Sequence, residues 1–547
     1  MIAVSNTVTN IKDFAFAYSN LEEISIPNSV LNIGNGAFTG CKSLKQIIIP
    51  DSVSSIGNGA FDGCSALEQI SIPNSVTNIS NRAFAGCKSL KQIIIPDSVT
   101  CIGDEAFANC SILEHIIIPN SVVKIGHEAF CGCSSLQQIT IPNSVTNIGN
   151  EAFADCTALK HIIISNSVTI IGQGTFGGCK SLKQINIPNS VVNIGDMAFA
   201  GCVSLKHIII PNSVISIGNS AFSASKYYRH HFSSLSERAF PICCPPEPES
   251  EPELYSYYKE PYTYFDYSTS LLSQVIIPNS VINIGNGAFA GCSNLKQIHL
   301  PDSVTSIGNG VFFRCCSLTE IHIPDSVTSI GNGAFAECSA LKQIYIPNSI
   351  TKIGHGAFLK CKTLTRIDIP NSITIIADET FAGCSALNQI NISDSVTCIG
   401  NGTFAGCSAL TQIYIPDSVT KIGNGAFRKC ITLSQINIPN SITIISDETF
   451  AECSALRHIK IPDFTTIIGH NAFYKCISLE QLIIPDTVNN IGSKAFAECE
   501  SLKQITIPDF VANLGYEAID GCKSLDYKII TDWENCEREN EYNDIYD

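Results

Sequence analysis

Cysteine is the reactive residue type that recurs most regularly in this sequence, with 26 copies in 547 residues. Nineteen of them fall in two series with a constant step of 23 residues, one from Cys41 to Cys202 and one from Cys292 to Cys522. Thiols can bind metals or form disulfides, but side chains at the same position of successive repeats do not favour the crossed geometry of a disulfide. Pairs of the Cys-x-x-Cys type are absent from the sequence, and no histidine stands at zinc-site spacing from its closely spaced cysteines. We therefore interpret the recurring cysteines as small buried side chains with a weak S–H donor, and we expect no metal and no cofactor.

No set of residues typical of catalysis emerges from the rest of the sequence. Gly57-Asn58-Gly59 and its copies lack the lysine of a phosphate-binding loop, so we interpret them as turn residues. The eleven histidines are mostly one or more repeats apart, and no Ser-His-Asp set can be assigned. The sequence therefore predicts a protein that is not an enzyme.

Charge and hydropathy exclude further classes of function. Lysine and arginine number 33 and acidic residues 49, so the net charge of −16 disfavours binding to nucleic acid or to anionic lipid. No apolar run reaches the ~18 residues of a membrane span, and the first residues do not resemble an export signal. The sequence by itself therefore predicts no membrane span and a cytoplasmic location.

The step of 23 residues reflects a repeated unit, which we number from Leu44 as position 1 to Cys64 as position 21. Counting its phenylalanine column, with a degenerate copy at Phe240 and Ile519 as a substitute, gives 22 units. Apolar positions 4 and 6 alternate as in a strand with one buried face, and the proline at position 7 ends that strand. Positions 13, 17 and 21 are four apart, which predicts a helix-like return. We also expect the glutamines that recur at position 3 to hydrogen-bond from coil to coil.

One such unit cannot bury its own apolar edge, so successive units must stack into a solenoid. The pattern Leu-x-x-Ile-x-Ile-Pro-x-Ser-Val-x-x-Ile-Gly-x-x-Ala-Phe-x-x-Cys resembles the leucine-rich repeats of the BspA-like, or Treponema pallidum type, family across residues 6 to 530. The resemblance implies an α/β solenoid: a curved, right-handed superhelix of about 22 units of 23 residues, with a parallel sheet on its concave side and no catalysis. It also implies a cell surface as the alternative location, since members of the family include surface and adhesive proteins.

Composition divides the chain into four predicted parts. Residues 1–243 and 272–530 form N-terminal and C-terminal repeat arrays, separated by an acidic insertion rich in proline and tyrosine at residues 244–271. Residues 531–547 form an acidic tail. The insertion is typical of a loop that does not pack, although its tyrosines also suit a contact segment.

Specificity is expected at the outward strand positions, above all at position 5. In the second array this position is rich in polar and aromatic residues, the composition of a protein-contact surface. We predict that it binds a protein partner, or else a glycan, through these residues: His299, His322, Tyr345, Asp368, Asn391, Tyr414, Asn437 and Lys460. The alternative is a structural or coat-like protein that self-associates laterally, because position 5 of the first array is often isoleucine, as at Ile48, Ile94, Ile117, Ile163 and Ile209. The sequence does not determine the oligomeric state.

Overall fold

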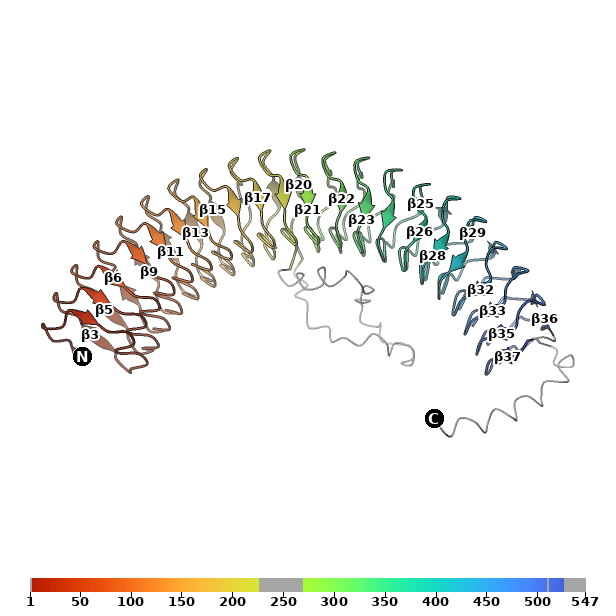
Figure 1. Cartoon of the computed structure of the whole chain (residues 1–547), viewed down its shortest axis with the longest axis horizontal. Helices are drawn as coiled ribbons and strands as arrows, with labels where there is room; N and C mark the ends of the chain where they lie inside the picture. The colour runs from red at the N-terminus through yellow and green to blue at the C-terminus, as the bar shows by residue number, and fades with distance from the viewer. Residues whose placement is uncertain (1, 226–268, 509–510, 526–547) are drawn as a thin grey trace, which may run out of the picture. The chain divides into compact units, whose positions relative to one another are not determined.

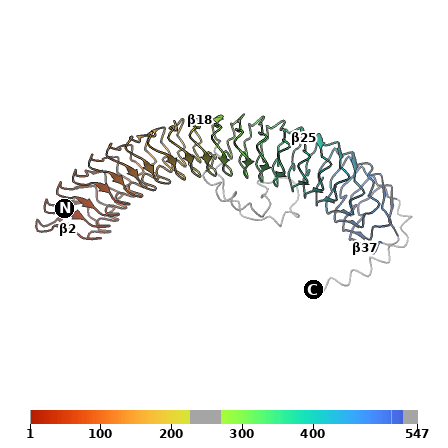
Figure 2. The same ribbon diagram turned by 45° about the horizontal axis from the view of Figure 1, so that its top comes forward.

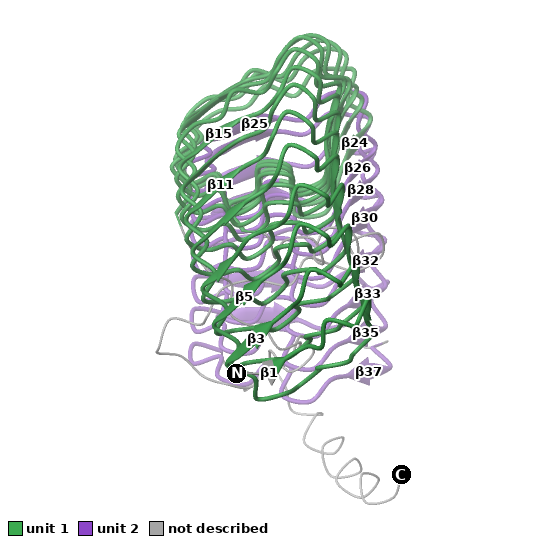
Figure 3. Ribbon diagram, turned by 90° about the vertical axis from the view of Figure 1, so that its left-hand side faces the viewer, with its two compact units in different colours: residues 1–357 green, residues 358–547 purple. Residues whose placement is uncertain are grey.

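The computed structural model describes residues 2–225, 269–508 and 511–525. The chain divides into two compact units, residues 1–357 and 358–547, and each is described by itself (Figure 3). The predicted tail lies outside the described residues, as does most of the predicted insertion. The two predicted arrays stay a prediction; the boundary between the compact units falls after Ala357.

Unit 1 consists of stacked coils whose short strands fall into two rows, and most coils contribute one strand to each row (Figure 1). The first row contains positions 3–5: β1 (Ile2–Ala3), β3 (Glu23–Ser25), β5 (Gln46–Ile48), β7 (Gln69–Ile70), β9 (Gln92–Ile94), β11 (His115–Ile117), β13 (Gln138–Thr140), β15 (His161–Ile163), β18 (His207–Ile209) and β20 (Gln274–Ile276). The second row contains positions 12–13: β2 (Asn10–Ile11), β4 (Asn32–Ile33), β6 (Ser55–Ile56), β8 (Asn78–Ile79), β10 (Cys101–Ile102), β12 (Lys124–Ile125), β14 (Asn147–Ile148), β16 (Ile170–Ile171), β17 (Asn193–Ile194), β19 (Ser216–Ile217), β21 (Asn283–Ile284), β22 (Ser306–Ile307), β23 (Ser329–Ile330) and β24 (Lys352–Ile353).

Unit 2 repeats this arrangement (Figure 2). Its first row contains β25 (Arg366–Asp368), β27 (Gln389–Asn391), β29 (Gln412–Tyr414), β31 (Gln435–Asn437), β34 (Gln481–Ile483) and β36 (Gln504–Thr506). Its second row contains β26 (Ile375–Ile376), β28 (Cys398–Ile399), β30 (Lys421–Ile422), β32 (Ile444–Ile445), β33 (Ile467–Ile468), β35 (Asn490–Ile491) and β37 (Asn513–Leu514). In both units strands pair in parallel with the equivalent residue of the next coil, as Gln46 does with Gln69. The predicted leucine-rich-repeat solenoid with parallel sheets is confirmed.

The return from the second row to the next coil differs from the predicted helix. Within the described ranges it contains turns and no α-helix, with left-handed backbone at positions 16 and 20, as at Gly59 (φ 60°) and Gly63 (φ 71°). This backbone directs alternate amides along the stack, so that Gly59 N–H donates to the Asn81 carbonyl at 2.8 Å and Gly63 N–H to the Ala85 carbonyl at 2.7 Å. An α-helix would satisfy its amides within the coil and would leave these carbonyls without partners.

Three side-chain columns also join one coil to the one before it. The Ser52 hydroxyl donates to the Val30 carbonyl at 2.7 Å, and the Cys64 thiol donates to the Phe38 carbonyl at 3.1 Å. At position 15, Asn58 N–H donates to the Asn35 side-chain oxygen at 2.8 Å. The nineteen recurring cysteines are free and buried, which confirms their interpretation as small buried side chains. These contacts explain why serine, asparagine and cysteine recur at positions 9, 15 and 21.

Phenylalanines at position 18 form the centre of the core in each unit. Phe61 is fully buried, and its ring stacks on those of Phe38 and Phe84 at centroid distances of 5.2 and 5.6 Å. In unit 2, Phe404 stacks in the same way on Phe381 at 5.7 Å. Because every coil contributes an equivalent ring, the core is a continuous column and not a closed cluster.

In unit 1 the coils before and after residues 226–268 stack directly on each other. Phe222 stacks on Phe289 at 5.6 Å, and His207 of β18 pairs with Gln274 of β20. Equivalent residues are 67 positions apart here, as in the bond from Asn286 N–H to the Asn219 side chain, whereas elsewhere they are 23 apart. The repeat predicted around Phe240 lies outside the described residues, and it adds no coil between those of Phe222 and Phe289.

Candidate partner-binding surface

Side chains at positions 3 and 5 of the first-row strands project away from the core. In β29, Ile413 at position 4 is 6% exposed, whereas Gln412 and Tyr414 on either side are both exposed. The alternation follows from the pleat of a strand, which directs successive side chains to opposite faces. We call this outward surface the first-row face. In each unit it is the surface on which the predicted binding residues lie.

In unit 1 the first-row face carries three of the predicted residues. His299 and His322 are paired by a parallel bridge, so their side chains stand on neighbouring coils. Tyr345 occupies the next coil and is 64% exposed. The structure therefore brings these three side chains into one line, one per coil.

In unit 2 the first-row face carries the other five. Asp368 pairs with Asn391, and Tyr414, which is 61% exposed, pairs with Asn437. Lys460 is exposed on the second coil after that of Tyr414. The two charged residues already have local partners, because Asp368 lies 3.1 Å from Arg366 and Lys460 lies 3.2 Å from Asp463. Exposed pairs of this kind contribute little to stability, so both charged groups can still exchange their partners.

The isoleucines of the first array lie on the first-row face of unit 1 and are strongly exposed. Ile94 and Ile117 are each 81% exposed and pair with each other across β9 and β11. Ile209 and Ile276 pair in the same way across β18 and β20. Together they form an apolar stripe: Ile48, Ile94, Ile117, Ile163, Ile209 and Ile276. Such a stripe is unusual on a surface that contacts only water.

The glutamine column at position 3 does not form the expected ladder. Within the described ranges, its one side-chain hydrogen bond between neighbouring coils joins Gln297 to Glu320, and none joins two glutamines. Since these side chains are exposed, water satisfies their amides as well as a neighbouring amide would. The amides of this column are therefore free to bind a ligand.

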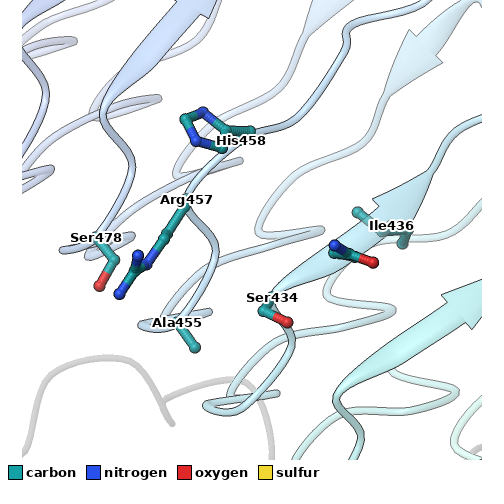
Figure 4. Close-up of a pocket in the computed structure, with 7 residues that line it drawn as sticks. Ser434, Ile436, Ala455, Arg457, His458 and Ser478 are labelled. Carbon is teal, nitrogen blue, oxygen red and sulfur yellow. The ribbon is translucent and has the colours of Figure 1, made fainter.

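Unit 2 also contains a hollow that sequence reasoning missed. Its volume is about 630 Å³, and it is lined by Ser434, Gln435, Ile436, Ala455, Arg457, His458 and Ser478 (Figure 4). It lies at an interruption in the strand pairing of the first row. β31 pairs with β29 on one side, but in the described part of the chain no strand pairing joins β31 to residues 458–460 on the other side. The arginine at position 2 of this coil, where other coils carry lysine, glutamate or an uncharged polar residue, is the one signal in the sequence that marks the place.

The chemistry that these surfaces offer is recognition. Their groups are aromatic rings, amides, imidazoles and a guanidinium. In the described ranges no cluster of three or more metal-ligating side chains occurs, and no helix there is long and apolar enough to cross a bilayer. In each unit the position-5 residues thus form a surface suited to a macromolecule, and in unit 2 a small hollow lies beside it.

The structure and its repeat together define a parallel β-solenoid of leucine-rich repeats. A sequence profile described as "BspA type Leucine rich repeat region" matches residues 9–122, 102–229, 261–388, 351–477 and 466–539, so the chain belongs to the BspA-type leucine-rich repeat family. The fold of this family commonly mediates protein–protein interaction, and its members are in general non-enzymatic scaffolds.

Solved structures similar to this chain include bacterial leucine-rich repeat proteins. One from Bacteroides ovatus is 27% identical, with a TM-score of 0.39, and the match covers 90% of this chain and 91% of that one. A leucine-rich cell surface protein from Faecalibacterium prausnitzii is 30% identical, with a TM-score of 0.38, covering 71% of this chain and 83% of that one. A leucine-rich repeat protein of T. pallidum is 23% identical, with a TM-score of 0.24, covering 44% of this chain and 78% of that one. No curated protein matches the chain.

Proposed function

We propose that this protein is not an enzyme and that it binds a protein partner through the first-row face, at His299, His322 and Tyr345 in unit 1 and at Asp368, Asn391, Tyr414, Asn437 and Lys460 in unit 2. The observation that carries the proposal is that in each unit exposed tyrosine, histidine or asparagine side chains occupy position 5 on successive coils. Tyr345 and Tyr414 are 64% and 61% exposed, so each ring has most of its surface available to a partner. Aromatic residues dominate the energetics of protein interfaces because they bury a large area at a small cost in conformational entropy.

A glycan is the second ligand class that this surface suits, since rings and amides also bind sugars. Adhesion, or another contact at a cell surface, is a narrower form of the same proposal and rests on the family alone. Neither changes which residues make the contact.

Replacing Tyr414 and Asn437 together by alanine is expected to reduce partner binding at least tenfold while leaving the fold intact. Both side chains project from paired strands into solvent, so their loss removes contact area but no core packing. The partner is first identified by capture on the immobilised full chain, and its Kd for each variant is then measured by surface plasmon resonance. The matched control is the double alanine variant of Thr420 and Thr443, which are exposed at position 11 of the same two coils and lie outside the first-row face. Unchanged affinity in the Tyr414 and Asn437 variant would show that unit 2 does not bind the partner where we propose.

The apolar stripe of unit 1 favours a second function, lateral self-association. If two molecules pair through this stripe, the wild-type protein shows a mass that rises with concentration in light scattering. Substituting Ile94, Ile117 and Ile163 by lysine is expected to abolish that rise, because three charges within four successive coils cannot be buried without partners. Substituting three exposed position-11 threonines of the second row, Thr77, Thr100 and Thr146, by lysine is the control for added charge. A monomeric wild-type protein at all concentrations would exclude this function.

A further inference from the structure

The floor of the hollow in unit 2 is apolar. At position 4 the first-row isoleucines are usually well buried, as Ile367 is at 1% and Ile413 at 6%. Ile436 is instead half-buried, as Ile390 and Ile505 are, and no strand pairing joins its coil to the next in the described part of the chain. Ile436 and Ala455 therefore present a small apolar surface inside the hollow.

The rim of the hollow is polar and basic. Arg457 and Ser478 lie at one side, and Ser434 lies on the neighbouring coil (Figure 4). None of the seven lining residues is acidic. The Ser434 hydroxyl donates to the Thr411 carbonyl, so its oxygen remains an acceptor only, whereas the guanidinium brings five N–H donors to the same hollow.

Arg457 forms no ion pair within the part of the chain that the structure describes. Nearby carboxylates lie against other cations: Glu452 is 3.6 Å from Arg428, Glu480, at position 2 of the next coil, is 3.3 Å from Lys503, and Asp463 is 3.2 Å from Lys460. A guanidinium beside a hollow, with no ion pair of its own, is available to an anion from outside the chain. A bidentate bond to a carboxylate is the arrangement that matches its planar set of donors.

We propose that this hollow binds a glutamate or aspartate side chain of the protein partner, with the carboxylate on Arg457 and the methylene carbons over Ile436 and Ala455. The inference rests on the proposed function, because the hollow adjoins Asn437 and Lys460 on the same face. It specifies the chemistry of the partner's contact segment, which would carry an acidic side chain flanked by residues that contact Tyr414 and Asn437. Glutamate fits better than aspartate, since its longer stem spans the apolar floor.

The test uses the full-length protein and a defined probe, fluorescein-labelled tetraglutamate with an amidated C-terminus, in fluorescence anisotropy at about 20 mM salt. Tetraglutamine with the same label is the neutral probe. We expect the wild-type protein to bind tetraglutamate, R457Q to bind it at least tenfold more weakly, and R457K to lie between them, because lysine keeps the charge but loses the planar fork. Raising the salt to about 300 mM is expected to weaken the wild-type complex, since the contact is exposed and ionic.

The matched control is K45Q, which removes an exposed lysine from position 2 of a coil in unit 1. Equal losses in R457Q and K45Q would show that general charge attraction holds the probe, and would overturn the proposal. So would unchanged binding in R457Q, equal binding of tetraglutamine, or no binding of tetraglutamate to the wild-type protein.

Failure of this inference is distinguishable from failure of the proposed function. If R457Q binds tetraglutamate normally while the Tyr414 and Asn437 variant loses the protein partner, the carboxylate subsite is wrong and the binding surface stands. If that variant keeps the partner, the surface itself is misplaced, whatever Arg457 does.

Discussion

Raising the pH from 8 to 11 is expected to unfold the solenoid in a steep transition that begins above about pH 9. Burial raises the pKa of four core thiols, those of Cys110, Cys384, Cys430 and Cys476, from an ordinary value of 9.0 to about 12. Because the folded state keeps these thiols protonated while the unfolded state ionises them, the folded state binds more protons between pH 9 and 12. The stability that the neutral thiols contribute is therefore fully present below about pH 9 and is lost as the pH rises toward 12.

The expected slope is large because many equivalent thiols act together. Each thiol held neutral in this window lowers the free energy of unfolding by about 1.4 kcal/mol per pH unit, or about 4 kcal/mol over three pH units. Four such thiols remove about 6 kcal/mol per pH unit, which is comparable with the whole stability of a typical domain. Circular dichroism during a pH titration, with reversal to pH 8, measures the midpoint and the number of protons released.

A cysteine variant provides the control for the other groups that ionise in this range. Cys430→Ala removes one buried thiol of unit 2, so its unfolding is expected to release about one proton fewer, although the small cavity lowers its stability at neutral pH. An alkaline transition that releases no more than one proton in the wild-type protein would contradict the account. So would rapid reaction of these four buried thiols with a thiol reagent at pH 8, because that reaction requires a thiolate that reaches solvent.

Phe107→Ala is expected to lower the free energy of unfolding of unit 1 by about 3–5 kcal/mol, the usual cost of removing a fully buried ring. Phe107 is 0% exposed and stacks on Phe84 at 5.5 Å and on Phe130 at 5.4 Å. Because each coil contacts only its neighbours, the ring contributes to two interfaces and its loss weakens both. Denaturant unfolding measures the change, and hydrogen exchange is expected to show faster opening of the coils on both sides.

Phe464→Ala is the matched control, because this phenylalanine is 63% exposed and lies outside the ring column. Its effect is expected to stay within about 0.5 kcal/mol. Similar losses in the two variants would mean that the ring column is not the main source of cohesion between coils. Exchange that accelerates uniformly along unit 1 in Phe107→Ala would instead show that the coils unfold as a single cooperative block.

The repeat step, the two strand positions and the apolar columns could all be predicted from the sequence, because each depends on a local period. Ile47 and Ile49 alternate with exposed residues as a strand requires. Pro50 ends the strand because proline has no N–H to donate to the neighbouring strand. The outward direction of Tyr414 and Asn437 follows from the same alternation. Periodicity thus determined which side chains are equivalent and which of them reach solvent.

The spacing of positions 13, 17 and 21 was misleading, because a period of four in side chains does not require helical backbone. Turns with left-handed residues such as Gly59 bring the same side chains to the core and also direct their amides to the next coil. The helix was favoured by considering one repeat alone. In the stack, hydrogen bonds between coils offset the cost of the left-handed conformation.

What the sequence by itself determined is the unit: its length, its strands, its buried columns and the class of solenoid that they build. Only the tertiary structure decided how one unit meets the next. The bonds from Ser52 to Val30 and from Cys64 to Phe38 span 22 and 26 residues, so they depend on the offset between coils and not on any local pattern. The hollow beside Ile436 lies where strand pairing is missing between two coils whose sequences both fit the repeat. A local pattern specifies which residues face inward. Contacts between coils depend instead on how the coil backbones stack, and this stacking is a property of the assembled array.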